Sequence, residues 1–317
     1  GPVFIWGRYS MLSTTPHELP TALITRAQQL PPVAMAIAGA DHPLALQSAW
    51  QATKSGLIIP TLVGPKADIE RIAKDLGWPL DGIRIVDAAP EGPSADAAVQ
   101  LASADEVQAL MKGQIHTDTL MRAIVSRDAG LRTDRRISHV FHMTAPGTDK
   151  ALMITDGAVN VAPNEHTLMD IVANAVTLGH ALGYDAPKVA MLSGSESVID
   201  SMPSTVLANR IVERANAGEI SNAHVAGPFA LDNAISMPAA QLKGITGPVA
   251  GQADILAVPN IEMGNALFKA LVYFRSALAA GIVLGAKVPI VLTSRADPPE
   301  ARLAATAIAQ IRAAHSG

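Results

Sequence analysis

The sequence contains no cysteine. This absence excludes disulfide bonds, thiolate zinc sites and a cysteine nucleophile. Aromatic residues are also scarce, at 3% of the 317 residues, whereas hydrophobic residues make up 49%. The core must therefore be filled by Ala, Val, Ile, Leu and Met, a composition that favours closely spaced helices on a Val- and Ile-rich sheet.

The sequence also lacks a long basic block, and its 24 Lys and Arg against 28 Asp and Glu give a formal net charge of -4. Nucleic acid and anionic membranes are therefore poor partners for this chain. The longest apolar tract, residues 277–292, is interrupted by Gly281, Gly285, Lys287 and Pro289. That pattern is not typical of a membrane-spanning helix, and we expect a cytoplasmic protein.

The glycine pattern of a dinucleotide site is missing as well. After the first predicted strand the sequence is AIAGADHP, in which Gly39 stands alone without the spaced glycines that hold a pyrophosphate. No phosphate loop ending in Gly-Lys-Ser or Gly-Lys-Thr follows a strand, and no histidine pair has metal-site spacing on a predicted helix. Nucleotide hydrolysis and Rossmann redox chemistry are disfavoured, and we expect no metal.

Short apolar or β-branched runs alternate with longer, Ala-rich helical patterns. Strands are predicted at residues 33–38, 57–63, 83–86, 139–144, 152–155, 188–192, 224–226, 254–258 and 288–293. Helices are predicted at residues 44–54, 67–76, 95–111, 117–127, 168–182, 199–216, 266–278 and 298–314. This alternation predicts an α/β fold with mostly parallel sheets and helices on their faces.

The length of the chain exceeds the usual size of one core, so two domains are expected. The segment APGTDK, residues 145–150, breaks the backbone between two apolar runs. We predict a first α/β domain over residues 11–146, completed by a C-terminal helix over 298–317, and a second over 147–297. Residues 1–10 hold three of the eleven aromatic residues, and we expect them to be a leader or a cloning remnant.

The most informative stretch is PIVLTSRADPPEAR, residues 289–302. An apolar run is followed by Ser294, Arg295 and Asp297, and a proline pair then starts a helix. In open α/β sheets ligands bind beyond the carboxyl ends of strands, where a hydroxyl, a guanidinium and carboxylates suit anion binding and proton transfer. A return to the first domain after Thr293 would place them in the interdomain cleft. The alternative interpretation is a helix cap, since Asp before two prolines caps a helix well.

A second cluster lies in MKGQIHTDTLMR, which contains Lys112, His116, Thr117 and Arg122. Gly113 ends one predicted helix, and Thr117 is expected to cap the next. A helix N-terminus beside Lys and Arg favours an anion site. The alternative is a solvated turn with ordinary surface charges.

A third cluster lies in ITDGAVNVAPN, where Asp156 and Asn160 follow a predicted strand. Gly157 allows close approach of the backbone, and Pro163 prevents simple continuation as a helix. A polar loop at the end of a strand is a candidate for ligand binding. The alternative is an Asx-type turn that only connects two elements.

A fourth cluster lies in VPNIEMGNALFKALVYFRSA, where Asn265, Lys269 and Tyr273 share one face of a predicted helix. A lysine near the start of a helix opposes the helix dipole. A purely structural role for Lys269 is therefore disfavoured, whereas an anionic ligand would offset the unfavourable interaction.

Taken together, these motifs resemble the phosphate acetyltransferase/phosphate butyryltransferase family from about Val33 to the C-terminus. The most specific pieces are ITDGAVNVAPN, GPFALDNAIS, GPVAGQADILAVPNIEMGNALFK and GIVLGAKVPIVLTSRAD. The TSRAD form resembles the butyryltransferase branch and the modules fused to enoyl-CoA hydratase-like domains, rather than the DLSRG form of dedicated acetyltransferases. The resemblance implies two α/β/α domains with a cleft between them, similar to isocitrate and isopropylmalate dehydrogenases, and a homodimer.

By this resemblance the reaction is reversible transfer of a short acyl group between coenzyme A (CoA) and inorganic phosphate. CoA and phosphate are substrates, and no prosthetic group is implied. The family's Ser-Arg pair matches Ser294, which would bond the reacting centre, and Arg295, which would hold phosphate. An arginine early in the helix after the Gly/His/Thr turn matches Arg122.

One departure from the family concerns the catalytic carboxylate of the acetyltransferases, which falls in register on Ala301. Alanine accepts no proton, so Glu300 or Asp297 would have to replace it, with Glu300 preferred, unless positioning of the substrates alone suffices. Two alternative functions stay open at this point. One is a decarboxylating NAD-dependent dehydrogenase of similar architecture, and the other is a catalytically inactive CoA-binding module.

Overall fold

The computed structural model describes residues 11–315. The predicted leader over residues 1–10 lies outside this range. The helices are α1 (Thr21–Gln28), α2 (Pro43–Lys54), α3 (Lys66–Leu76), α4 (Gly92–Ser103), α5 (Thr117–Val125), α6 (Glu165–Ala181), α7 (Pro203–Arg214), α8 (Leu231–Ile235), α9 (Met237–Leu242), α10 (Ile261–Arg275) and α11 (Pro299–Ala314). The strands are β1 (Val33–Ala38), β2 (Ile58–Gly64), β3 (Arg84–Asp87), β4 (Ala109–Lys112), β5 (Ser138–Thr144), β6 (Leu152–Thr155), β7 (Lys188–Leu192), β8 (His224–Phe229), β9 (Ile255–Ala257), β10 (Leu278–Leu284) and β11 (Ile290–Val291).

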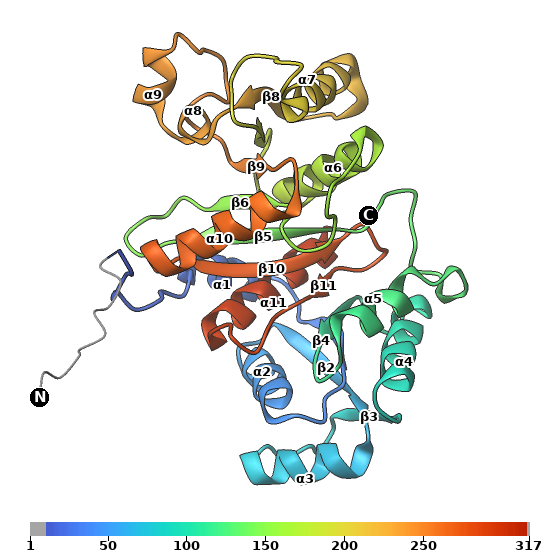
Figure 1. The fold of residues 1–317 in the computed structure, drawn as a ribbon. Helices are drawn as coiled ribbons and strands as arrows, with labels where there is room; N and C mark the ends of the chain where they lie inside the picture. Colours follow the sequence, from blue (N-terminus) through green and yellow to red (C-terminus); the bar gives the residue numbers. More distant parts are fainter. Residues whose placement is uncertain (1–10, 316–317) are drawn as a thin grey trace, which may run out of the picture.

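These strands form one 11-stranded sheet in the order β3-β2-β1-β4-β11-β10-β5-β6-β9-β7-β8. The outer strands pair in parallel, whereas β11-β10, β10-β5 and β5-β6 are antiparallel in the centre. Helices cover the sheet along its length (Figure 1). The predicted α/β class with a mostly parallel sheet is confirmed.

Three apolar clusters fill the layers between helices and sheet. One joins α2, α6 and α11 to the sheet, a second lies under α4 and α5, and a third lies under α8 and α10. Alanines dominate the buried face of α11, which allows this helix to lie close to β10 and β11. Among the described helices, none has the length and hydropathy that crossing a membrane requires.

The helix predicted over residues 95–111 is wrong in its second half. Helix α4 ends at Ser103, and β4 follows at Ala109–Lys112 between β1 and β11. The run of Ala109, Leu110 and Met111 is too short for its hydrophobic periodicity to distinguish a strand from a helix. Its burial between two strands decides the conformation.

The apolar tract over residues 277–292 forms two antiparallel strands, β10 and β11, of which only the second was predicted, at residues 288–293. Helix α10 stops at Arg275 because Ser276 adopts a left-handed backbone conformation, and the chain continues as β10. Gly285, at a φ of 96°, then turns the chain toward β11, and a Cβ there would overlap the carbonyl oxygen of Arg136. This hairpin-like return brings Thr293 to the carboxyl end of β11.

The sheet runs without interruption across the predicted domain boundary at residues 146/147, because β5 pairs with both β6 and β10. Helix α11 contacts α1 and α2 of the predicted first domain and also β10 and α6 of the predicted second domain, so its contacts do not assign it to one of them. The division into residues 11–146 with 298–317 and 147–297 stays a prediction.

Candidate functional site

Two turns that follow neighbouring parallel strands are fixed to each other at the carboxyl ends of β1 and β4. Gly113 N–H donates to Ala38 O at 2.8 Å, and Gln114 N–H donates to Gly39 O at 2.7 Å. A Cβ at Gly113 would overlap the carbonyl oxygen of Gly39. Glycine is therefore required at Gly113 for the two backbones to approach this closely.

A cavity of about 410 Å³ opens above these turns. Its walls come from the first turns of α2, the β4-α5 turn and the segment that follows β11. It is lined by His42, Leu44, Ala45, Ser48, Glu91, Met111, Lys112, Gly113, Gln114, Ile115, His116, Thr117, Thr293, Ser294, Arg295 and Arg302. Its place beyond the carboxyl ends of the strands is where ligands bind in open α/β sheets.

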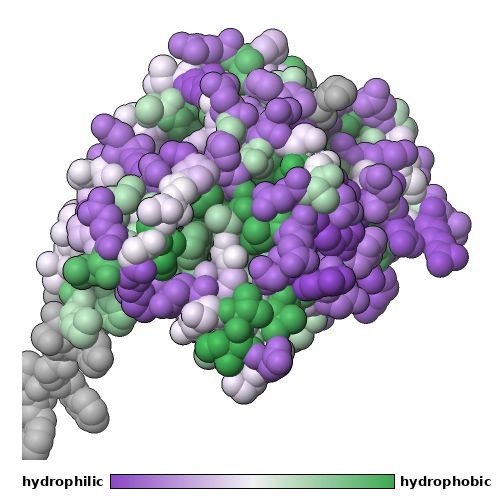
Figure 2. Space-filling view, turned by 90° about the horizontal axis from the view of Figure 1, so that it is seen from above, coloured by the Kyte–Doolittle hydropathy of each residue, from purple (hydrophilic) through white to green (hydrophobic). Residues whose placement is uncertain are grey.

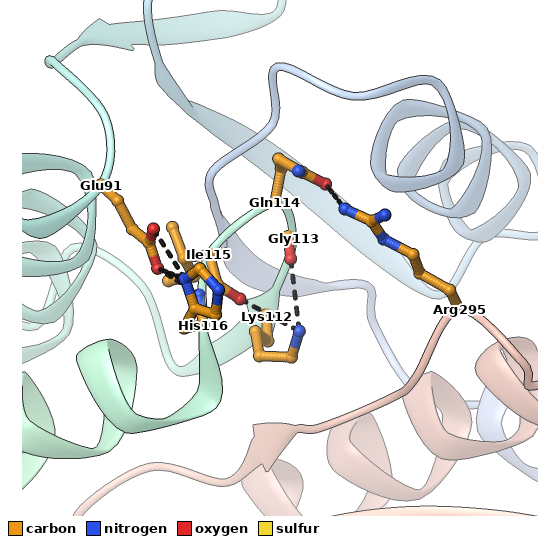
Figure 3. A network of polar contacts seen from close by, with 7 residues as sticks. All are labelled: Glu91, Lys112, Gly113, Gln114, Ile115, His116 and Arg295. Carbon is orange, nitrogen blue, oxygen red and sulfur yellow. Dashed lines mark hydrogen bonds and ion pairs between the residues drawn. The ribbon is translucent and has the colours of Figure 1, made fainter.

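Positive charge gathers on one wall of the cavity. Arg295 Nη2 donates to Gln114 Oε1 at 2.8 Å, which holds the guanidinium above the turn, and Lys112 Nζ donates to Ile115 O at 3.2 Å (Figure 3). Burial lowers the pKa of Lys112 and of His42, and the nearby positive charge of Arg295 lowers both further. The positive charges of Lys112 and Arg295, which disfavour one another in this way, are stabilised by an anion between them.

The negative group on the cavity wall is Glu91, and it is already engaged. Its carboxylate accepts from the backbone N–H of His116 and from His116 Nδ1 at 2.8 Å (Figure 3). The backbone hydrogen bond is the main reason why the pKa of Glu91 is lowered, followed by the bond from the imidazole. The Glu91 carboxylate therefore anchors the β4-α5 turn.

Two helix N-termini face the same cavity. His42 is the N-cap of α2, and its Nδ1 accepts from Leu44 N–H at 3.1 Å, while His116 is the N-cap of α5. The predicted cap at Thr117 is wrong by one residue, because Thr117 is the first residue of the helix. The positive ends of both helix dipoles favour an anion in the cavity.

The segment after β11 folds back on itself. Asp297 Oδ2 accepts from Ser294 N–H at 2.8 Å, and Arg302 Nη1 donates to Asp297 O at 2.6 Å. The helix cap considered for Asp297 is wrong, because Pro298 is the N-cap of α11 and no side chain caps it. Burial raises the pKa of Asp297, against the effect of the Ser294 hydrogen bonds and the charge of Arg302.

The cavity brings together five of the predicted site residues, namely Lys112, His116, Thr117, Ser294 and Arg295. Asp297 lies next to Ser294, because its carboxylate accepts a hydrogen bond from the backbone N–H of Ser294. Glu300 lies in the first turn of α11 and Arg122 is exposed on α5. Neither of these two side chains lines the cavity.

Asp156 and Asn160 belong to a buried turn away from the cavity. The Asp156 carboxylate, 2% exposed, accepts from the backbone N–H groups of Ala158, Val159 and Asn160. Asn160 Nδ2 donates to Asp156 Oδ2 at 2.7 Å and to a backbone carbonyl. These contacts are those of the Asx-type turn considered as the alternative for this segment.

Asn265 and Lys269 lie on α10, and neither side chain lines the cavity. Lys269 is exposed and Asn265 is partly buried. A role for either in substrate binding stays a prediction.

Several polar lining residues were not among the predicted site residues, including His42, Ser48, Glu91, Gln114 and Arg302. Arg302 could have been predicted from the sequence, because it is the last residue of the PIVLTSRADPPEAR segment. Gln114 lies within the second predicted cluster, MKGQIHTDTLMR. His42 and Glu91 follow β1 and β3 and come near that cluster only when the sheet forms. Within residues 11–315 no group of three or more His, Cys, Asp or Glu side chains is placed to hold a metal ion.

The arrangement can bind a phosphate-sized anion against Arg295 and Lys112 and place it beside the hydroxyl of Ser294. Because the side chains come from α2, the β4-α5 turn and the segment after β11, one bound anion contacts three parts of the fold. The Asp297 carboxyl, with its raised pKa, lies next to Ser294 as a candidate proton acceptor.

Comparisons with known proteins agree with this chemistry. A family model described as phosphate acetyl/butaryl transferase matches residues 91–310. The chain is 45% identical to a phosphate acetyltransferase of Rickettsia prowazekii (strain Madrid E) over 90% of this chain and 82% of the relative. It is 38% identical to a phosphate butyryltransferase of Clostridium beijerinckii over 93% and 97%. A solved branched-chain phosphotransacylase from Enterococcus faecalis V583 superposes with a TM-score of 0.77 at 34% identity and covers 89% of this chain and 99% of that one.

Proposed function

Because the chain belongs to the phosphate acetyl/butaryl transferase family of acyltransferases, we propose that the cavity beneath Arg295 is the phosphate site of this acyltransferase. The resemblance found in the sequence is thereby confirmed. The proposed reaction is acyl-CoA plus phosphate giving acyl phosphate plus CoA, and its reverse. The observation that carries the site is the convergence of Arg295, Lys112 and two helix N-termini on one cavity whose lining carboxylate is already bonded to His116.

In the direction of acyl-CoA synthesis, the CoA thiol loses its proton and the sulfur attacks the acyl carbonyl carbon. The carbon–oxygen bond to phosphate then breaks, and phosphate leaves with the bonding electrons. Negative charge grows on the departing oxygen, where the planar guanidinium of Arg295 can donate two parallel hydrogen bonds. Ser294 is placed to donate a hydrogen bond to the reacting centre. Both substrates are bound together in this scheme, and no covalent enzyme intermediate forms.

A panel of acyl-CoA esters of increasing chain length, each incubated with phosphate, tests this function. Release of CoA is followed with a thiol reagent, and the chain itself adds no background because it contains no cysteine. We expect release that requires phosphate and depends on acyl length. Release without phosphate, or none with any ester, would contradict the proposal. No observation on the described residues favours the dehydrogenase alternative, which predicts nicotinamide reduction with NAD and a hydroxy acid.

We further propose that Asp297, rather than Glu300, accepts the thiol proton. Asp297 is bonded to the backbone of Ser294, and burial raises its pKa, which brings it closer to that of the thiol. The Asp297→Asn variant is expected to lose about 100-fold in kcat, whereas Glu300→Gln stays within a few fold of wild type.

The dependence of the thiolysis rate on pH tests this role. The carboxylate form of Asp297 accumulates as the pH rises through its raised pKa, so the wild-type rate should fall as the pH drops below that pKa. This acid limb of the pH profile should disappear in Asp297→Asn. The measurement is kcat against pH for both variants. Loss of the acid limb in Glu300→Gln alone would assign the role to Glu300.

CoA is proposed as a substrate rather than a prosthetic group, and a cytoplasmic location stays a prediction.

We also propose a homodimer in which a second copy covers α10. Gly264 is the one buried residue of this helix, and Tyr273 on it is 60% exposed. Exposed apolar residues also occur on α8 and α9, and patches of apolar surface appear on the face seen from above (Figure 2). Sedimentation of the wild-type chain measures its mass in solution.

A further inference from the structure

Arg302 enters the cavity from α11 with much of its hydrogen-bonding capacity unused. Its Nη1 donates to Asp297 O at 2.6 Å. Its Nε is buried and has no hydrogen-bond partner among the described residues. A guanidinium has five N–H donors in a fixed plane, and a buried donor without a partner is unfavourable. The side chain is therefore held at one end while other donors remain available to a ligand.

The start of α11 determines which residue reaches the cavity. Ala301, which falls in register with the carboxylate of the acetyltransferases, is 1% exposed and packs in the core. The next residue, Arg302, lines the cavity instead. In this chain α11 therefore presents a cation to the cavity from the residue that follows the position where the resemblance implies a carboxylate.

Arg302 adds a second guanidinium to a cavity that already contains Arg295 and Lys112. The Arg302 side chain lies on the side of the cavity nearest α2, because it also lines a neighbouring cavity of about 310 Å³ together with Trp50 and Lys54 of that helix. Positive groups that approach a cavity from different elements are suited to an anion with several oxygens around one centre. Inorganic phosphate and the phosphoryl end of an acyl phosphate both have this shape.

We propose that Arg302 is a second phosphate-binding arginine, which donates to oxygens of the same phosphate that Arg295 holds. This inference rests on the proposed function, because it assigns a ligand within the same site. Arg302 then stabilises the departing phosphate as its charge grows, and it fixes the 294–297 segment through the Asp297 carbonyl. No additional covalent step is involved.

The test compares Arg302→Gln and Arg302→Lys with wild type in steady-state kinetics. Arg302→Gln is expected to raise the KM for phosphate about 10- to 100-fold and to leave the KM for acyl-CoA within about threefold. Arg302→Lys keeps the charge without the planar fork, and its KM for phosphate is expected to lie between those of wild type and Arg302→Gln. The rise in melting temperature that inorganic phosphate gives the wild-type protein should shrink in Arg302→Gln.

The control variant is Arg71→Gln, which removes the same charge from an exposed pair with Asp68 on α3 and should behave as wild type. A rise in the KM for acyl-CoA without a rise in the KM for phosphate would overturn the assignment and place the guanidinium against CoA. Unchanged KM values for both substrates would also overturn the assignment. If Arg302→Gln does not fold, a wild-type KM for phosphate in Arg302→Met overturns the proposal. Phosphate-dependent melting is measured without turnover, so failure of the proposed acyl transfer remains distinguishable from failure of this assignment.

Discussion

Replacing Arg295 by alanine is expected to lower kcat/KM for phosphate-dependent acyl transfer about 100- to 1000-fold while the fold stays intact. Arg295 is exposed, and its one described side-chain hydrogen bond is to Gln114. Loss of that contact costs little stability, because interactions of exposed side chains are weak. A guanidinium aimed at the charge that develops in the transition state contributes several kcal/mol, and each 1.4 kcal/mol corresponds to about tenfold in rate.

Two further variants separate the contribution of charge from that of geometry at this position. Arg295→Lys keeps the charge but loses the bidentate fork, and it is expected to recover only part of the rate. Gln114→Ala removes the amide that orients the guanidinium and should lower the rate less than Arg295→Ala. Circular dichroism and urea midpoints equal to wild type would show that folding is preserved. Wild-type kinetics in Arg295→Ala would remove Arg295 from the phosphate site.

The Ser294–Arg295 segment was predictable because its position after an apolar run follows from local sequence alone. Lys112, His116 and Thr117 on the other side of the cavity were predicted as a separate anion site, but their position opposite Arg295 was not, since it depends on long-range pairing. Gly39 was noted only as a glycine that fails a dinucleotide fingerprint. In the structure its carbonyl accepts from Gln114 N–H, and that bond exists only once β1 and β4 lie side by side.

The errors in the fold have the same origin. Residues 109–112 and 278–284 are apolar runs whose strand conformation is determined by neighbours far along the sequence. Where Gly, Pro, Asp or Ser residues flank an apolar run, as at β1, β6 and β7, the predicted bounds coincide with the observed ones. Asp156 illustrates the limit for sites, because one polar residue after a strand is compatible with both a ligand contact and an Asx-type turn.

The free energy of unfolding is expected to fall steeply as the pH drops from about 6.5 to about 4. His139 and His142 lie on β5 between β10 and β6 and are 1% and 6% exposed. Burial lowers the pKa of each to about 4, although the charge of Asp156 opposes this effect at His139. In the unfolded chain both titrate near about 6.5. The unfolded state therefore binds protons first, and each histidine costs on the order of 3 kcal/mol of stability across this window.

Urea unfolding at pH 7, 6, 5 and 4.5 measures this loss, and substitution tests its origin. In His142→Leu the slope of stability against pH should fall to about half, because one of the two buried imidazoles no longer titrates. The exposed His224 offers a matched control, and His224→Ala should keep the wild-type slope. Nδ1 of both buried imidazoles has no hydrogen-bond partner among the described residues. Equal stability at pH 7 and pH 5, or an unchanged slope in His142→Leu, would mean that these histidines accept protons in the folded state.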